Sequence, residues 1–171
     1  MPRWFECLLV LLTLPLWLPM IGVICLVQLC TGQKVFFCQR RPGLHGIPFT
    51  LWKFCTMREG SEPDEARMTR VGRFLRKTSL DELPELFHVL SGKMSLVGPR
   101  PLLVEYLDLY TEEEHHRHDV RPGITGWAQI HGREMEDLKA KVALDLEYVR
   151  RRSFGFDLKI LCLTLLHLKG K

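Results

Sequence analysis

The sequence predicts a mostly helical α+β protein with a membrane-inserted N-terminus, and three observations support this prediction. A run from Leu8 to Leu29 contains no charged residue. Two stretches rich in aromatic and β-branched residues follow it, separated by turn-forming residues. Farther along the chain, apolar residues recur at helical spacing. The 171 residues have room for one domain with a core, which we expect at 34–171, in the cytoplasm, after a membrane-embedded segment at 1–33.

The apolar run is long enough to reach across a bilayer. As one helix, its roughly 22 residues would span about 33 Å, close to the thickness of the hydrocarbon layer. A signal peptide is a poorer interpretation, because Arg3 is the one basic residue before the run and no small-x-small cleavage site follows it. Lys34, Arg40 and Arg41 flank its C-terminal end, which predicts that the rest of the chain lies in the cytoplasm.

Two prolines interrupt this helix near its middle. Pro15 and Pro19 each lack the helical N–H and clash with the carbonyl group one turn back, so a bend or break is expected. A kinked helix could still cross the membrane, and a sharply broken one could instead enter and leave by the same face. The residues alone favour neither arrangement.

A β-hairpin is expected next. Lys34–Gln39 and Ile47–Cys55 have the composition of strands, and Arg40–Gly46 between them is rich in turn formers. Arg58–Glu65 contains glycine, proline and acidic residues, and predicts an exposed loop.

Helices are expected over most of the remaining chain. Thr69 is the predicted N-cap of a helix that ends near Lys77, and a second helix begins near Ser79. Three further helices are predicted: a short one opened by the capping-box pattern Thr111–Glu114, an amphipathic one over Glu134–Arg152, and a last one over about Phe156–Leu168, which is a candidate for the membrane interface.

The composition disfavours several functions. The six cysteines form no Cys-x-x-Cys pair, so neither a zinc site nor a disulfide framework is predicted. Arginines recur every third residue from Arg67 to Arg76, but a membrane anchor fits nucleic-acid binding poorly, and no nucleic-acid partner is expected. His115, His116 and His118 lack the spacing of known zinc sites.

Asp81 and Glu82 are the first candidate catalytic residues. Ser79 before them and its spacing to Glu82 fit a helix-capping box, which would be purely structural. Adjacent carboxylates at a helix start also suit a Mg²⁺ ligand or a nucleophile. The two interpretations are compatible, because a carboxylate held by a cap is also a positioned one.

Three arginines lie close to glycine or proline residues that shape the backbone. Arg100 stands between Pro99 and Pro101, which would hold its guanidinium group ready for a phosphate. Arg121 precedes a Pro-Gly pair, and Arg133 follows a glycine. A structural turn explains each arginine alone, whereas the three together predict an anion site.

Taken in order, these segments resemble the monotopic phosphoglycosyl transferases, a family of bacterial sugar transferases, over nearly the whole chain. The resemblance rests on the proline-interrupted membrane helix and on further motifs. These are Phe36–Gly43 (FFCQRRPG), Lys53–Met57 (KFCTM), Thr78–Leu86 (TSLDELPEL), Val97–Pro101 (VGPRP) and His116–Gly126 (HRHDVRPGITG). The last motif is especially similar to the small stand-alone members, one of which transfers diacetylbacillosamine phosphate.

The resemblance implies a two-step transfer of a sugar 1-phosphate from a UDP-sugar to a polyprenyl phosphate, with release of UMP. Asp81 would match the nucleophile that forms a covalent phosphosugar intermediate, and Glu82 would match its partner. Both are also expected to hold Mg²⁺. Phosphate or substrate binding is expected from Lys53, Arg76, Pro99, Arg100, Arg121 and Arg133.

The family's membrane helix breaks at a Ser-Pro pair and re-enters the same face. Leu18 and Pro19 lie nearest to that pair, so the resemblance favours a re-entrant helical hairpin in the bacterial cytoplasmic (inner) membrane. This chain departs from the family pattern in having Leu18 for Ser, an additional Pro15, Cys55 for a basic residue and His131 for Asn.

The expected donor is an N-acetylated UDP-sugar, because the closest-looking relatives use one. The lipid bilayer is an expected partner, and a homodimer is left open. The alternative from another class is a catalytically silent membrane scaffold that recruits glycosyltransferases. The presence of Asp81, Glu82, Arg76 and Arg100 argues against this scaffold.

Overall fold

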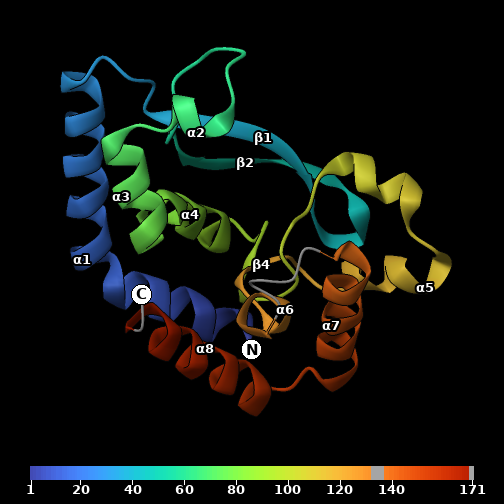
Figure 1. Ribbon diagram of the computed structural model, residues 1–171. Coiled ribbons are helices and arrows are strands. Elements are labelled where there is room, and N and C mark those ends of the chain that lie inside the picture. The colour runs from blue at the N-terminus through green and yellow to red at the C-terminus, as the bar shows by residue number, and fades with distance from the viewer. Residues whose placement is uncertain (132–136, 170–171) are drawn as a thin grey trace.

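The computed structural model describes residues 1–131 and 137–169, most of which are helical (Figure 1). The helices are α1 (Arg3–Cys30), α2 (Asp64–Arg67), α3 (Arg70–Thr78), α4 (Glu85–Leu90), α5 (Glu112–His115), α6 (Trp127–His131), α7 (Leu138–Arg151) and α8 (Phe154–Lys169). The 3₁₀ turns are η1 (Leu44–Gly46), η2 (Leu80–Glu82), η3 (Val104–Leu109) and η4 (His116–His118). Two small sheets pair β1 (Phe36–Pro42) with β2 (Pro48–Phe54) and β3 (Ser95–Val97) with β4 (Gly123–Thr125). The predicted α+β, mostly helical class is confirmed.

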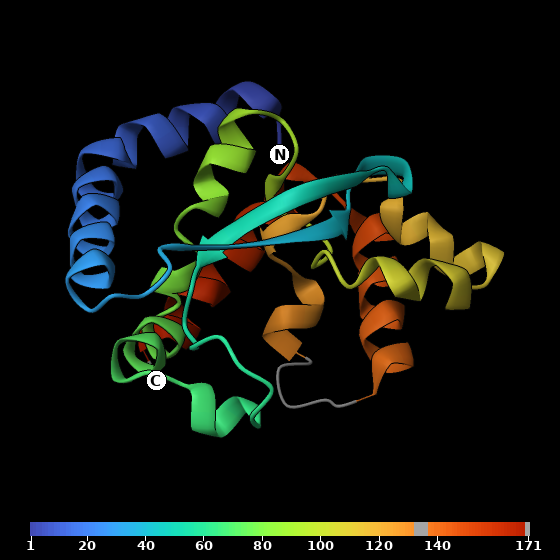
Figure 2. The same ribbon diagram turned by 90° about the horizontal axis from the view of Figure 1, so that it is seen from above.

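Helix α1 is continuous but sharply bent, as Figures 1 and 2 show. Pro15 and Pro19 lie inside it, and each removes a backbone hydrogen bond that would keep the helix straight. The indole N–H of Trp17 donates to the carbonyl oxygen of Val10 at 3.0 Å, and thereby bridges the segment that contains Pro15. The expected bend is therefore present without a break in the helix.

One face of α1 belongs to the core of the domain. Val10, Trp17, Ile21 and Ile24 are buried and recur at roughly helical spacing. They pack with residues from the hairpin, from α3 and from the α4 region, namely Leu51, Phe54, Leu75, Val89 and Met94. The N-terminal helix is thus a structural part of the domain.

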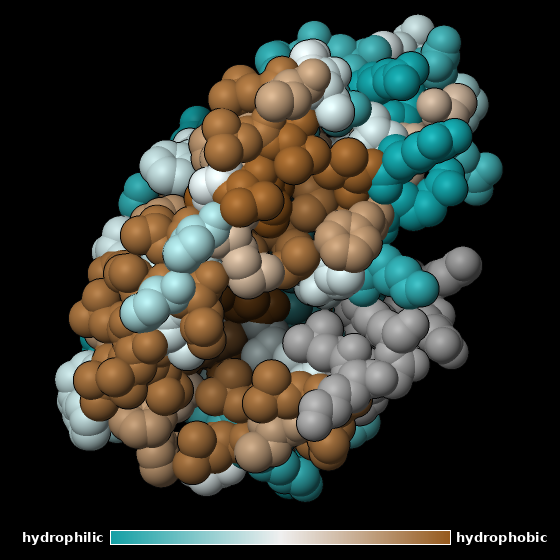
Figure 3. Space-filling model, turned by 90° about the vertical axis from the view of Figure 1, so that its left-hand side faces the viewer, coloured by the Kyte–Doolittle hydropathy of each residue, from teal (hydrophilic) through white to brown (hydrophobic). Residues whose placement is uncertain are grey.

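The other faces of α1 are apolar and uncovered. Large hydrophobic side chains are exposed along its length, namely Trp4, Leu8, Leu11, Leu12, Leu16, Leu18, Met20, Val23, Leu26, Val27 and Leu29. Figure 3 shows a largely hydrophobic surface on the side of the molecule where α1 lies. Within the described ranges, α1 is the one helix long and apolar enough to cross a membrane. A surface of this kind marks a contact with lipid or with another protein.

The predicted β-hairpin is confirmed, with strand ends that differ from the prediction. β1 and β2 pair antiparallel, and Phe36 lies opposite Phe54. Arg40 and Arg41, predicted to lie in the connection, belong to β1 because the turn is confined to η1. Alternate residues of each strand face the same side of the hairpin.

The segments around Arg100 and Arg121, which are rich in glycine and proline, contribute the parallel strand pair β3–β4. The sequence had suggested turns there and no strand. Ser95 lies opposite Gly123, and Val97 lies opposite Thr125. The strands approach so closely that a Cβ atom on Gly123 would lie 2.0 Å from the backbone nitrogen of Gly98. Glycine at these positions therefore permits the two backbones to meet.

Local helix signals are largely confirmed. The hydroxyl of Thr69 accepts a hydrogen bond from an N–H in the first turn of α3 at 2.8 Å, and Thr111 forms a capping box with Glu114. Helix α7 begins after its N-cap Asp137. Residues 134–136 of the predicted helix lie outside the described residues.

We expect Gly123→Ala to destabilise the protein. The added methyl group would overlap the backbone nitrogen of Gly98 at 2.0 Å and the carbonyl oxygen of Thr125 at 2.5 Å, and neither atom can move without disrupting β3–β4. Overpacking typically costs about 1–3 kcal/mol, or roughly 2–4 °C of melting temperature per kcal/mol in a chain of this size. Thermal unfolding of the purified protein measures the effect.

The matched control is Gly155→Ala, because nothing lies within 4 Å of the added Cβ atom there. Equal melting temperatures for the two variants would contradict the close approach of β3 and β4.

Candidate active site

Asp81 and Glu82 lie in the tight turn η2 between α3 and α4. Ser79, predicted to cap the following helix, instead ends α3 with a left-handed φ of 58°. An N-cap residue usually has extended backbone, and Ser79 makes no side-chain capping bond to η2. The predicted capping box is therefore wrong, and the turn itself sets the direction of the two carboxylates.

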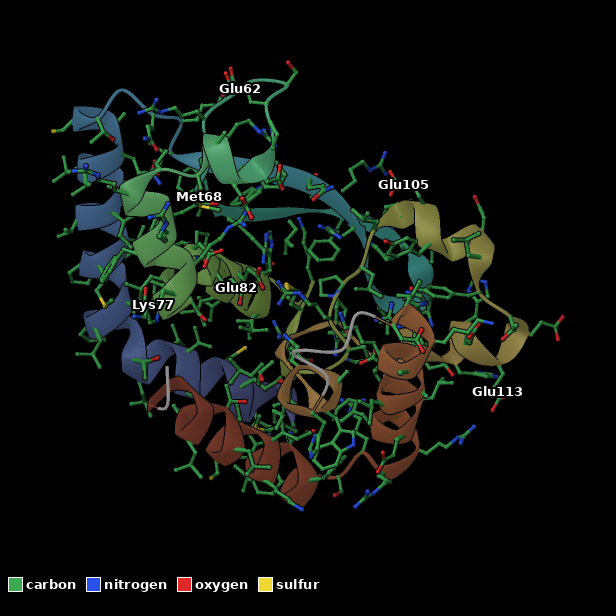
Figure 4. The ribbon with its side chains drawn as sticks, viewed as in Figure 1. Glu62, Met68, Lys77, Glu82, Glu105 and Glu113 are labelled. Carbon is green, nitrogen blue, oxygen red and sulfur yellow. The ribbon has the colours of Figure 1, made fainter. Side chains whose placement is uncertain are left out.

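This turn borders a cavity of about 1020 Å³, a volume typical of ligand-binding sites. The charged residues that line it are Arg41, Lys53, Arg76, Asp81, Glu82, Arg100, Lys141 and Asp145. Figure 4 shows Glu82 in the interior of the molecule, whereas Glu62, Glu105 and Glu113 lie near its periphery. Because cations outnumber carboxylates among the described residues of the lining, this part of the cavity is suited to an anionic ligand.

Glu82 is held by two cations from different segments. Its Oε1 accepts hydrogen bonds from Lys53 Nζ at 2.7 Å and from the Arg100 guanidinium group at 2.8 Å. Burial alone would raise the pKa of Glu82, but Arg100 and Lys53 outweigh burial and hold this pKa well below its ordinary value. Glu82 is therefore ionised at neutral pH and fixed in one orientation.

Glu85 is a third carboxylate at this site, and the sequence analysis assigned it no role. Its side chain is buried, and its Oε1 lies 3.1 Å from Lys53 Nζ, so one lysine is shared by Glu82 and Glu85. Burial raises the pKa of Glu85 to about 7; Lys53 offsets part of this effect, and the charge of Glu82 adds to it. The signal in the sequence was an acidic residue among the apolar residues of 83–90.

Asp81 differs from Glu82 because no cation among the described residues is paired with it. Burial and the adjacent Glu82 raise the pKa of Asp81, while Lys53 and Arg76 act in the opposite direction. Arg76 lines the same cavity, and its Nε donates to the Thr56 hydroxyl at 3.0 Å. Asp81 is thus a partly desolvated carboxylate available to a ligand.

A buried ion pair between Arg117 and Asp145 holds the backbone of Arg100 in place. Arg117 is 1% exposed and Asp145 is 2% exposed, and the two lie 2.6 Å apart. Arg117 also donates to the carbonyl oxygen of Arg100 at 2.9 Å. Asp145 lines the cavity but is neutralised by Arg117. Neither residue was assigned a role from the sequence, although Asp145 stands between apolar residues within Val142–Leu146.

Some predicted binding residues lie away from the cavity. Arg121 does not line it, and its Nε donates to the carbonyl oxygen of Gly92 at 3.0 Å. Pro99 borders a separate small hollow on the other side of Arg100. Arg133 lies outside the described residues. Lys53, Arg76 and Arg100, by contrast, meet around the Asp81–Glu82 pair.

The sequence is similar to those of known sugar transferases. A family model described as bacterial sugar transferase matches residues 1–170. The sugar transferase EpsL of Bacillus subtilis is 57% identical over 83% of this chain and 73% of its own length. The UDP-glucose:undecaprenyl-phosphate glucose-1-phosphate transferase of Xanthomonas campestris pv. campestris is 39% identical over 97% of this chain, but only 38% of its own length.

A third relative is the UDP-N-acetylgalactosamine-undecaprenyl-phosphate N-acetylgalactosaminephosphotransferase of Aeromonas hydrophila. It is 36% identical over 95% of this chain and 42% of its own length. The chain therefore spans less than half of the Xanthomonas and Aeromonas relatives and most of EpsL.

The raised pKa of Glu85 predicts a specific dependence of stability on pH. Because this pKa rises from 4.5 to about 7 on folding, protonation of Glu85 stabilises the folded state at low pH, and this contribution is lost as the pH rises through 7. Glu85→Gln, which resembles the protonated form, should be more stable than the wild type at about pH 8 by on the order of 1 kcal/mol or more.

Melting temperatures of both proteins between about pH 5 and about pH 8 measure the difference. Glu62→Gln, at the exposed periphery, is the control and should follow the wild type. A constant difference between Glu85→Gln and the wild type at every pH would rule out the titration of Glu85 in this range.

Proposed function

This chain belongs to the bacterial sugar transferase family, and from that premise we propose that it transfers a sugar 1-phosphate from a UDP-sugar to a polyprenyl phosphate. The products would be UMP and a polyprenyl diphosphate-linked sugar. The proposal depends on one observation, namely that the two adjacent carboxylates have different partners. Glu82 is held by two cations, whereas Asp81 is available to a ligand in the cavity.

In the first step, a carboxylate oxygen of Asp81 attacks the β-phosphorus of the UDP-sugar. A bond forms between this oxygen and phosphorus, the bond from phosphorus to the bridging oxygen breaks, and UMP leaves with the bridging oxygen. The product on the protein is an acyl phosphate that carries the sugar. Such a mixed anhydride keeps the transfer potential needed for a second reaction.

In the second step, a phosphate oxygen of the polyprenyl phosphate attacks the same phosphorus. The bond between Asp81 and phosphorus breaks, which releases the lipid-linked product and regenerates the free carboxylate. Glu82 is a poor proton acceptor, because its pKa is lowered. Its role in our proposal is to hold Lys53 and Arg100 beside the phosphates.

Phosphoryl transfer depends mainly on positioning and on neutralisation of charge. Lys53, Arg76 and Arg100 all line the cavity around Asp81, and the carbonyl bond from Arg117 steadies the backbone of Arg100. Together these groups would offset the negative charge of a diphosphate as it reacts.

Mg²⁺ is the cofactor that we propose. Within the described ranges, no group of three or more His, Cys, Asp or Glu side chains could hold a metal ion. Mg²⁺ is commonly bound by one or two carboxylates together with substrate phosphates, and Asp81 with Glu82 fits this donor set. The bound ion would neutralise charge on the transferred phosphate, and we expect it to bind together with the nucleotide.

We further propose that α1 enters and leaves the membrane by the cytoplasmic face of the bacterial inner membrane. The two ends of the helix contact the same domain. Arg3 donates to the carbonyl oxygen of Leu90 at 3.0 Å, and Gln28 donates to that of Cys55 at 2.8 Å. A spanning helix would place its ends on opposite sides of a hydrocarbon layer about 30 Å thick, which is incompatible with both contacts.

The identity of the sugar stays a prediction. The names of the relatives include both UDP-glucose and UDP-N-acetylgalactosamine, so they do not single out an N-acetylated donor. Incubation of the protein with a panel of UDP-sugars and undecaprenyl phosphate, with UMP release as the readout, would identify the donor. A wild-type protein that released no UMP from any of them would favour the catalytically silent scaffold.

Asp81→Asn should abolish UMP release, because the amide is a poor nucleophile. We expect a loss of at least about 10³-fold, together with loss of the sugar-phosphate adduct on the protein in intact-protein mass spectrometry. The control is Asp64→Asn, on the exposed surface of α2, which should retain both signals. Normal turnover by Asp81→Asn would refute the assignment of the nucleophile.

The topology predicts where single cysteines can be labelled. Trp4→Cys and the native Cys30 are both exposed and lie near opposite ends of α1. Each should be placed alone in a variant whose other native cysteines are replaced by serine, and should then react with a membrane-impermeant maleimide in inverted vesicles and not in intact spheroplasts. Labelling of position 4 in spheroplasts would mean that α1 crosses the membrane, and would contradict the re-entrant arrangement.

A further inference from the structure

Arg41 is a cavity-lining residue to which the proposed mechanism gives no role. It lies near the end of β1, and Phe37, Gln39 and Arg41 all line the cavity, as expected for alternate residues of one strand. Arg40 between them is exposed and is not part of the cavity lining. The hairpin therefore presents one of two adjacent arginines to the site.

The guanidinium group of Arg41 is only partly satisfied. Its terminal nitrogen donates to Gln39 Oε1 at 2.7 Å, which fixes the orientation of the side chain. Its Nε is buried and has no hydrogen-bond partner. No carboxylate among the described residues forms an ion pair with it, although Glu85 and Glu105 are close enough to act on its charge. A buried, unpaired donor on a charged group is costly unless a ligand completes it.

Arg41 also lies close to a second cation. Both residues line the same cavity, and burial together with the nearby positive charge of Arg100 lowers the pKa of Arg41. Arg100 is compensated by Glu82 at 2.8 Å, whereas Arg41 has no such partner. An anion that contacts both groups would relieve their mutual repulsion.

We propose that Arg41 and Arg100 together bind the diphosphate of the nucleotide-sugar donor, with Arg41 contacting a phosphate oxygen. This inference rests on the proposed function and assigns the donor subsite within it. Arginine is suited to the task because its planar fork matches two phosphate oxygens.

The position of Arg41 favours the donor over the lipid phosphate. Figure 1 shows β1 beginning beside the end of α1 and running away from it, toward η3, and Arg41 is next to the last residue of this strand. A polyprenyl phosphate would reach the cavity from the apolar surface that α1 presents. We therefore place the soluble nucleotide at the end of the hairpin that lies away from α1, where Arg41 is found.

The first test is binding of UDP, measured by isothermal titration calorimetry on the detergent-solubilised protein. Arg41→Gln should weaken UDP binding by about 10- to 100-fold, as expected for loss of a charge-assisted hydrogen bond. The matched control Arg40→Gln should bind UDP like the wild type, and uridine, which has no phosphate, should bind both variants equally. Equal loss of uridine and UDP binding in Arg41→Gln would mean general damage to the site and would overturn the proposal.

The second test separates the two sources of phosphate. In the UMP-release assay, Arg41→Gln should raise the KM for the UDP-sugar and leave the KM for polyprenyl phosphate unchanged. A raised KM for the lipid alone would overturn the assignment to the donor. Arg41→Lys, which keeps the charge but not the guanidinium group, should lose less UDP affinity than Arg41→Gln and more than Arg40→Gln; an affinity equal to the wild type would overturn the requirement for a guanidinium group at this position.

These outcomes are distinct from failure of the proposed function. If the wild-type protein released no UMP from any UDP-sugar, the transferase assignment would fall. Loss of UDP binding in Arg41→Gln, with uridine binding retained, would still support the anion subsite.

Discussion

The carboxylate of Glu82 is the junction on which the architecture of the cavity depends. Lys53 binds it from the hairpin and Arg100 binds it from the segment after β3, at sequence separations of 29 and 18 residues. A buried carboxylate is unfavourable without such partners, so these contacts draw three distant segments to one point. Because Lys53 and Arg100 are bound to Glu82, its neighbour Asp81 has no ion pair within the described residues, and the difference between the two adjacent acids follows from the packing.

The arginines of this fold fall into two groups. One group lines the cavity, and the other binds backbone carbonyl oxygens away from it. Arg76 and Arg100 line the cavity. Three other arginines donate to backbone carbonyl oxygens instead. Arg3 donates to the end of α4, Arg121 to the loop that follows α4, and Arg117 to the carbonyl oxygen of Arg100. In both groups the guanidinium group is held in place by hydrogen bonds. The arginines of the cavity keep part of this group for an anion, whereas the other arginines satisfy carbonyl oxygens that would otherwise lack a partner.

This dual use explains which parts of the site the sequence could predict. The Asp81–Glu82 pair, Lys53, Arg76 and Arg100 were identified from motifs, and the structure brings them together. Arg121 has the same local signature as Arg100, but the tip of its side chain meets Gly92, and no local pattern reveals that partner. Glu85 and Asp145 were missed for the same reason, since their roles come from Lys53 and Arg117 in distant segments. For the fold, the local caps at Thr69 and Thr111 were predictable, whereas the β3–β4 pair depends on glycines that resemble turn formers.

The packing of α1 has a consequence for how the protein matures. Val10, Trp17, Ile21 and Ile24 contribute to the same core as Leu51 and Val89, so α1 cannot be exchanged for another apolar helix without changing this core. A truncated form without residues 1–33 would lose part of the hydrophobic interior and expose the surface beneath it to water. In the re-entrant arrangement that we propose, insertion of α1 into the bilayer and packing of this core would therefore be coupled.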